Sequence, residues 1–150
     1  MVRIAIQAED FDVGRQITAL TAGQTAIGGI GSFIGVVRDT SGTLSSLTLE
    51  HYPHMTEQAI AQIAGEAERR WDLLGCTIIH RVGELHPGDN IVLVLAAAPH
   101  RHAALEATSF LIDWLKTKAP FWKKESFTDG TERWVDARDT DDQAAARWVA

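Results

Sequence analysis

The chain has 150 residues, which suits one domain over residues 1–150 with a buried core, and its 45% hydrophobic and 23% charged residues are typical of globular proteins. Its formal net charge of −6 at pH 7 argues against general nucleic-acid binding, which requires a broad basic face. No apolar run approaches the roughly 20 residues that cross a membrane, and the N-terminus becomes acidic too early for a signal or transit peptide, so we expect a cytoplasmic protein.

The first third of the chain predicts strands and one short helix. Residues 2–7 alternate apolar and polar side chains, as a half-buried strand does. Asp12 is the expected N-cap of a short helix that follows. Residues 25–38 are apolar and rich in glycine, which predicts a long or bent strand with glycines at bulges or close contacts. A turn over 38–42 then leads to an alternating strand over 45–52.

A helix is predicted after Pro53, with Thr56 as its N-cap. Apolar side chains recur on one side of this helix at helical spacing, while charged side chains occupy the other side. We expect the apolar side to be buried. Its members are Ile60, Ile63, Ala64, Ala67 and Trp71.

Two apolar strands follow over 76–83 and 91–98, and we expect them to pair antiparallel because a Pro-Gly-Asp turn lies between them. A second helix is predicted over 101–118, and Pro120 cannot continue it. The apolar stripe of this helix is Ala104, Ala107, Leu111 and Leu115.

The C-terminal part predicts a hairpin and a helix. Residues 121–127 and 132–137 are typical of a closing hairpin, and a final short helix is expected with Asp139 or Thr140 as its cap. The whole pattern therefore indicates an α+β fold with a mostly antiparallel sheet.

The single cysteine, Cys76, allows neither a disulfide nor a CxxC metal site within one chain. Its surroundings, LLGCTIIH, are typical of the start of a buried strand. We interpret it as a small buried hydrophobic residue rather than a reactive thiol.

Two other groups of residues suggest ligands. The glycines of 25–38 do not match the GxGxxG spacing and no helix follows them, so we interpret them as packing glycines. His100 and His102 form an HxH pair, but a metal site needs three or four ligands. Because Arg101 and a helix start lie beside them, an anion is favoured over a metal ion.

Four lysines lie within residues 116–124 of this acidic chain. Pro120 forces a turn between Lys116 and Lys123, which can bring their ammonium groups together. Two close ammonium groups repel, which lowers the pKa of at least one, and a partly neutral lysine can act as an acid, a base or a nucleophile. Lys118 is explained by the negative end of the helix dipole, and a solvated basic face remains an alternative for the whole group.

Several stretches of the chain form a longer pattern. They are FIGVVR (33–38), LTLEHYPHMTE (47–57), IIHRVGELHPGD (78–89), the HR of PHRH (99–102), LKTKAPFWKKE (115–125) and RWVDAR (133–138). In order and spacing they closely resemble the large, catalytic subunit of molybdopterin synthase, from about residue 3 to Trp148. The K-T-x-A-P-F-W-K motif is the most specific part of the resemblance.

The resemblance implies an α/β hammerhead-type fold and a sulfur transfer without a metal or cofactor of the subunit's own. Members of this family convert cyclic pyranopterin monophosphate (precursor Z) into molybdopterin. The sulfur comes from the C-terminal thiocarboxylate of a small, ubiquitin-like carrier subunit. The large subunits form a homodimer within a heterotetramer, and the active site is expected to draw on both of them, with His100 and Arg101 crossing the dimer.

The resemblance also implies roles for individual residues. Lys116 is expected beside the thiocarboxylate carbonyl as general acid/base or as a stabiliser of developing charge, with Lys123 assisting. Residues 120–122 are expected to support the two lysines. The contacts to the anionic groups of the substrate are expected from Arg38, His100, Arg101 and, as a weaker member, Arg138. Cations suit this site because the pterin phosphate and the carrier tail are both anionic.

Two other classes of function remain open from the residues alone. A non-catalytic module could use the basic patch to hold an acidic peptide or a nucleotide, with the neighbouring aromatic residues stacking on bases. A zinc hydrolase built on His100 and His102 would require stoichiometric metal in the purified protein.

Overall fold

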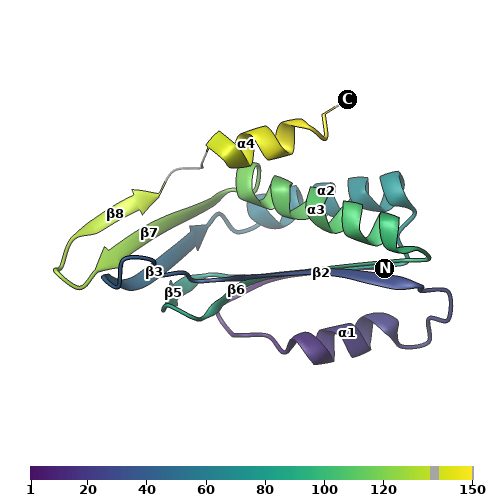
Figure 1. Ribbon diagram of the computed structural model, residues 1–150, viewed down its shortest axis with the longest axis horizontal. Helices are drawn as coiled ribbons and strands as arrows, with labels where there is room; N and C mark the ends of the chain where they lie inside the picture. The colour runs from purple at the N-terminus through teal and green to yellow at the C-terminus, as the bar shows by residue number, and fades with distance from the viewer. Residues whose placement is uncertain (136–138, 150) are drawn as a thin grey trace.

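The computed structural model describes residues 1–135 and 139–149, which form two four-stranded sheets and four helices (Figure 1). The first sheet has the order β1-β4-β6-β2, which is Val2–Gln7, Gly75–Arg81, Asn90–Ala98 and Gly29–Val36. The second sheet has the order β5-β3-β7-β8, which is Gly83–Leu85, Leu44–His51, Phe121–Phe127 and Glu132–Val135. The helices are α1 (Val13–Thr21), α2 (Met55–Trp71), α3 (Arg101–Thr117) and α4 (Asp139–Ala146).

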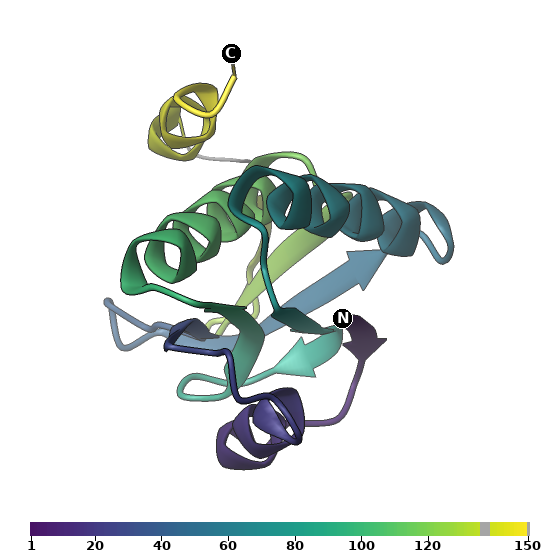
Figure 2. The ribbon, with the colours of Figure 1, turned by 90° about the vertical axis from the view of Figure 1, so that its right-hand side faces the viewer.

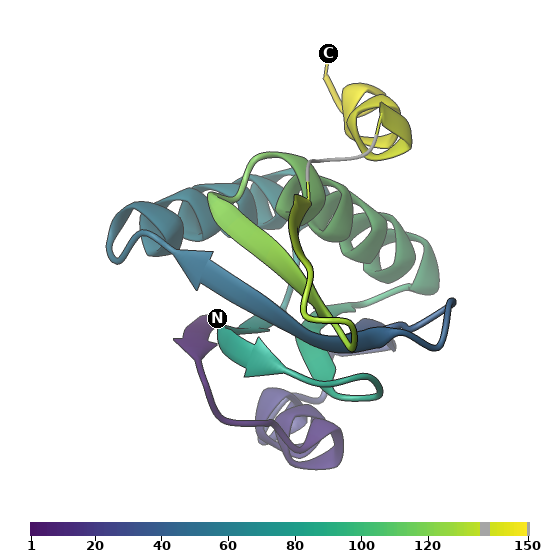
Figure 3. The same cartoon turned by 90° about the vertical axis from the view of Figure 1, so that its left-hand side faces the viewer.

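The helices cover both faces of the first sheet. Helices α2 and α3 lie side by side on one face, α1 lies on the other, and α4 lies beyond α3 (Figures 1 and 2). Because both faces of β4 and β6 are covered, these central strands are almost continuously apolar. The second sheet extends from one end of this layered body, with β3 and β7 adjacent (Figure 3).

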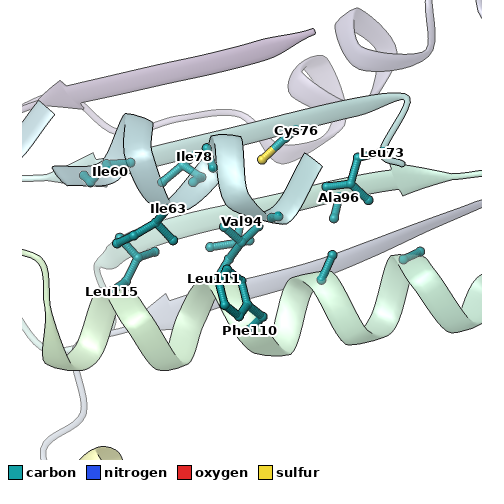
Figure 4. Close-up of a cluster of buried hydrophobic side chains, with 14 of the residues drawn as sticks. Ile60, Ile63, Leu73, Cys76, Ile78, Val94, Ala96, Phe110, Leu111 and Leu115 are labelled. Carbon is teal, nitrogen blue, oxygen red and sulfur yellow. The ribbon is translucent and has the colours of Figure 1, made fainter. Parts of the chain in front are cut away.

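The largest group of buried side chains lies between the first sheet and helices α2 and α3 (Figure 4). The apolar stripes predicted for the two helices are confirmed: Ile60, Ala64 and Ala67 of α2 are fully buried, as are Ala107 and Leu111 of α3. A smaller cluster lies under α1 and a third joins the two sheets. Within the described residues, no helix is long and apolar enough to cross a membrane.

Most elements follow the sequence-based predictions. The Asp12 carboxylate accepts a hydrogen bond from the backbone N–H of Arg15 at 3.0 Å, which confirms Asp12 as an N-cap. Strands β4 and β6 pair antiparallel as expected, while β1 and β4 pair parallel. Strands β7 and β8 form the predicted hairpin, and the final helix α4 is present. The side chains of Asp139 and Thr140, its predicted caps, lie outside the described residues.

The prediction of Thr56 as an N-cap is wrong. Helix α2 begins at Met55, and its N-cap position is occupied by His54, whose φ of 68° is left-handed and whose side chain makes no capping bond. Thr56 is instead fully buried within the first turn. Its hydroxyl accepts a hydrogen bond from the N–H of Tyr52 at 3.2 Å and donates one to the carbonyl oxygen of Pro120 at 3.3 Å. The hydroxyl therefore ties α2 to the turn after α3.

Two predicted strands have different limits in the structure. The strand predicted over 25–38 is shorter, Gly29–Val36. The strand predicted over 76–83 ends at Arg81, because Gly83 adopts a φ of 90° that turns the chain out of the first sheet. Gly83 is also the first residue of β5 (Gly83–Leu85), which belongs to the second sheet.

The interpretation of the glycines as packing residues is confirmed where β2 crosses α3. A Cβ atom on Gly31 would clash with the hydroxyl of Thr108 and the carbonyl oxygen of Ala104. A Cβ atom on Gly28 would clash with the carbonyl oxygen of Pro99. The close approach holds β2 against the helix while its outer edge stays unpaired by other strands of the described chain.

Candidate functional site

A pocket of about 490 Å³ lies where α3 ends and the two sheets meet. Apolar side chains from β2, β6 and α3 form much of its wall. Its charged and aromatic lining residues are Phe33, Arg38, His80, Lys116, Phe121 and Lys123.

The two lysines reach this pocket because the chain reverses between them. Lys116 lies in the last turn of α3, and Lys123 lies on β7, where it pairs with buried Leu49 of β3. The reversal is fixed by a hydrogen bond from the N–H of Phe121 to the carbonyl oxygen of Ala119, at 2.9 Å. The predicted convergence of Lys116 and Lys123 across the turn is therefore confirmed.

Lys124 points away from the pocket. Its ammonium group lies 3.5 Å from the carboxylate of Glu132 and 5.9 Å from the ring centroid of Trp134. Successive residues of a strand point to opposite faces, so Lys123 and Lys124 separate as the sequence predicted. Lys118 also lies elsewhere, with its ammonium group over the ring of Trp114. Of the four lysines, Lys116 and Lys123 therefore line the pocket, together with Arg38.

His80 is a pocket residue that the sequence analysis did not single out. It lies on β4, is 6% exposed, and stacks on Phe121 with ring centroids 3.8 Å apart. The pKa of His80 is lowered from 6.5 to about 4, chiefly by burial and also by the positive charges of Lys123 and Lys116, against the opposing effect of a hydrogen bond to the carbonyl oxygen of Arg81. The feature of the sequence that could have identified His80 is its position as a titratable residue within a largely apolar central strand.

His100 and Arg101 do not reach this pocket within one chain. They lie at the start of α3 and line a second pocket of about 790 Å³, together with Ser109 and Arg147. Arg101 lies beside Gly29, at the end of β2 opposite to the one that lines the first pocket. The length of β2 puts these two ends about 23 Å apart at roughly 3.3 Å per residue.

The remaining sequence-based candidates are a thiol, a histidine pair and an arginine. Cys76 is fully buried in the main core (Figure 4), and burial raises the pKa of its thiol to about 12, which confirms the interpretation as a buried hydrophobic residue. In the described ranges, no group of three His, Cys, Asp or Glu side chains is arranged to hold a metal ion, and this includes His100 and His102. Arg138 lies outside the described residues.

Comparison with known proteins gives a consistent result. The model of the MoaE protein family matches residues 6–118. A molybdopterin synthase catalytic subunit from Mesorhizobium japonicum is 57% identical over 146 residues, which is 97% of this chain and 92% of the relative.

Solved structures agree in fold. The MoaE protein of Burkholderia ambifaria superimposes with a TM-score of 0.85 at 51% identity, over 99% of this chain and 98% of that one. Molybdopterin synthase from Staphylococcus aureus superimposes with a TM-score of 0.78 at 31% identity, over 89% of this chain and 96% of that one. The α+β arrangement, the pocket and its lysines therefore occur on a scaffold shared with these proteins.

Proposed function

The chain belongs to the MoaE protein family, and from this premise we propose that it is the catalytic subunit of a molybdopterin synthase. In this role it converts cyclic pyranopterin monophosphate into molybdopterin, a step in the synthesis of the molybdenum cofactor. The sulfur comes from the C-terminal thiocarboxylate of a small, ubiquitin-like carrier subunit. The main support is the pocket in which Lys116, Lys123 and Arg38 converge.

The charges of the pocket suit the two reactants. The carrier tail and the pterin phosphate are both anionic, so they repel each other unless cations lie between them. Lys116 is exposed on the pocket wall, where a carrier tail can reach it. There it stabilises the negative charge that develops on the carbonyl oxygen when the carbon–sulfur bond breaks, or it transfers a proton. Lys123 is half-buried and assists from β7, and Arg38 can bind a phosphate with two parallel hydrogen bonds.

The apolar part of the pocket strengthens these interactions. Phe33 and Ile34 of β2 and Leu115 of α3 line the pocket beside the cations. When an extended carrier tail fills the pocket, water is displaced and charge–charge interactions inside it become stronger. A tail that ends in glycine is thin enough to pass between such walls.

The position of β2 suggests how His100 and Arg101 take part. Strand β2 is an edge strand, and its Ile34 and Val36 side chains are 37% and 48% exposed, which leaves a strand edge and apolar surface for a second copy. If two copies pair antiparallel through β2, the Gly29 end of one strand lies beside the Val36 end of the other. The partner's His100 and the partner's Arg101 then lie next to the lysine pocket, where they bind the phosphate of the substrate.

The complete assembly is a central homodimer with one carrier subunit bound to each large subunit. Arg138 remains a proposed contact to the substrate. We assign the protein to the cytoplasm, because a single buried thiol is typical of proteins from reducing compartments.

A single-turnover reconstitution tests the function. The purified protein is mixed with thiocarboxylated carrier and cyclic pyranopterin monophosphate, and dithiolene formation is followed for wild type, Lys116→Ala and the matched control Lys118→Ala. We expect product from wild type and the control, and a rate at least about 100-fold lower for Lys116→Ala with carrier binding retained.

The other outcomes assign the function differently. Absence of product from wild type with an authentic carrier would refute the enzymatic role. Equal rates for wild type and Lys116→Ala would move the catalytic role to Lys123. A variant that binds carrier poorly but turns over normally at saturation would indicate that Lys116 only binds.

A further inference from the structure

Residues 37–43 connect β2 of the first sheet to β3 of the second, and this loop carries Arg38 into the wall of the lysine pocket. The Arg38 side chain is exposed, and its guanidinium group forms no ion pair with a carboxylate of the described residues, although Asp39 is its neighbour in the chain. The guanidinium group is therefore available to an anion. Its position depends on what holds the loop on either side of it.

Val37 fixes the start of the loop. Its side chain is 3% exposed and belongs to the buried cluster that joins the two sheets. The N–H of Val37 donates a hydrogen bond to the carbonyl oxygen of Asp89 at 2.8 Å, and its carbonyl oxygen accepts one from the N–H of Gly88 at 2.9 Å. The residue before Arg38 is thus held by packing and by two backbone hydrogen bonds to the turn that precedes β6.

Asp39 closes the loop on the other side of Arg38. Its Oδ1 atom accepts hydrogen bonds from the N–H of Gly42 at 2.9 Å, the N–H of Leu44 at 3.3 Å and the hydroxyl of Ser41 at 3.4 Å. Leu44 is buried in the same cluster as Val37, so the carboxylate ties the loop to its own fixed end. A carboxylate suits this task because it accepts several hydrogen bonds at once and binds donors more strongly than a neutral oxygen.

We propose that Asp39 is a positioning residue for Arg38: its carboxylate holds residues 39–44 in one conformation and thereby keeps the Arg38 guanidinium group at the pocket. This inference rests on the proposed function and adds a residue to its site. A loop that is ordered before the substrate arrives avoids the entropy cost of ordering Arg38 on binding. A carboxylate that is bonded to the loop backbone also competes less with the substrate phosphate for the guanidinium group.

The charge of Asp39 by itself predicts the opposite effect on anion binding. Removal of a negative charge beside the pocket makes the pocket more positive, so on this account both Asp39→Ala and Asp39→Asn should bind anions more tightly. If Asp39 acts by holding the loop, Asp39→Ala should bind anions more weakly. Asp39→Asn keeps an oxygen acceptor and should then bind them at least as well as wild type.

NMR without substrate or carrier tests the positioning role. We expect the backbone order parameter of Gly42 to be about 0.8 in wild type and Asp39→Asn, and to fall below about 0.6 in Asp39→Ala. Inorganic phosphate, followed through the Nε–H signal of Arg38, should bind about 5- to 10-fold more weakly to Asp39→Ala than to wild type.

Asp12→Ala is the matched control. It also removes one carboxylate and a hydrogen bond to a backbone N–H, but at α1, on the opposite face of the first sheet from α2 and α3 (Figure 2). Its Gly42 order parameter and its phosphate affinity should equal those of wild type.

Several outcomes would overturn the proposal. These are an unchanged order parameter of Gly42 in Asp39→Ala, phosphate binding by Asp39→Ala as tight as that of wild type, and equal weakening in Asp39→Ala and Asp39→Asn. A wild-type Arg38 signal that does not respond to phosphate would also overturn it. Because these measurements use neither carrier nor turnover, their failure leaves the sulfur transfer itself untouched.

The reconstituted reaction separates positioning from a purely structural role. Asp39→Ala should raise the substrate concentration that gives half the maximal single-turnover rate by about 5- to 10-fold and change the maximal rate by less than about 2-fold, because a misplaced arginine still binds at saturation. Asp39→Asn should restore the wild-type concentration. A lower maximal rate with an unchanged half-saturating concentration would contradict the proposal. Absence of product from wild type would refute the sulfur transfer and leave the NMR results interpretable.

Discussion

The rings of His80 and Phe121 are stacked face to face, with centroids 3.8 Å apart and planes inclined by 15°. His80 belongs to the first sheet and Phe121 to the second, so this contact joins the two sheets beside the lysine pocket. The Thr56 hydroxyl donates a hydrogen bond to the carbonyl oxygen of Pro120, which precedes Phe121. The position of the pocket lysines therefore depends on contacts between segments that are far apart in the chain.

Replacement of Thr56 by valine should destabilise the protein by about 1–2 kcal/mol. Valine has nearly the same shape but leaves the Tyr52 N–H and the Pro120 carbonyl oxygen without their partner. Urea unfolding measures the effect, with Thr18→Val as a control whose hydroxyl bonds only to a carbonyl of its own exposed helix. A Thr56→Val protein as stable as wild type would show that the Pro120 turn is held by other contacts.

The stability of the protein should fall as the pH is lowered from about 6.5 to about 4. The pKa of His80 is lowered from 6.5 to about 4 by burial, so the unfolded chain binds a proton in this range that the folded protein does not. The contribution is fully present above pH 6.5 and amounts to about 3 kcal/mol lost by pH 4. Urea unfolding of wild type and His80→Phe at several pH values isolates this effect, because the variant should lack that part of the pH dependence. Parallel curves would contradict it.

Cys76 should be inert in the folded protein. Its thiol is fully buried, and burial raises its pKa to about 12, so almost no thiolate exists at neutral pH. Labelling with a thiol-specific reagent at pH 8 should be at least about 100-fold slower in buffer than in urea. Cys76→Ala should retain sulfur transfer, because the carrier delivers the sulfur. Rapid labelling of the native protein, or loss of turnover in Cys76→Ala, would argue for a reactive thiol.

Two glycine-to-alanine changes should have opposite effects. At Gly31 the added methyl group would meet the Thr108 hydroxyl and the Ala104 backbone, and we expect a loss of about 2 kcal/mol or more. At Gly65, inside α2, the nearest atom is the end of the flexible Arg69 side chain at 3.5 Å. Alanine there should stabilise the protein by about 0.5–1 kcal/mol, because it restricts the unfolded chain. Thermal unfolding of both variants checks the signs, and equal effects would contradict the close approach of β2 to α3.

A site shared between two copies can be tested by mixing inactive variants. Lys116→Ala and Arg101→Ala should each be inactive as homodimers. In a mixed dimer one site combines both defects and the other combines two intact residues, so random mixing should restore about one quarter of the wild-type activity. No recovery after subunit exchange would place Arg101 in the same site as the Lys116 of its own chain, or outside the site.

The sequence by itself determined most of the helices and strands, and it identified the cationic residues that line the site. Helical periodicity reports which side of a segment is buried, and it correctly gave the buried sides of α2 and α3. Pro120 made a turn between Lys116 and Lys123 unavoidable, so their convergence could be predicted from chain geometry.

Other features could be decided only by the tertiary structure. Thr56 lies where an N-cap residue is expected in the sequence. Its hydroxyl instead donates a hydrogen bond to the carbonyl oxygen of Pro120, 64 residues further along the chain. In the sequence, His80 is a polar residue within a largely apolar strand. It lies near Lys116 and Lys123 because the first and second sheets pack together through the contact between His80 and Phe121. His100 and Arg101 lie at the opposite end of β2 from the lysine pocket, a separation that residue spacing alone does not indicate. The reason is physical: local sequence specifies that a face is buried, whereas the partner that buries it comes from a distant segment whose position depends on the packing of the whole chain.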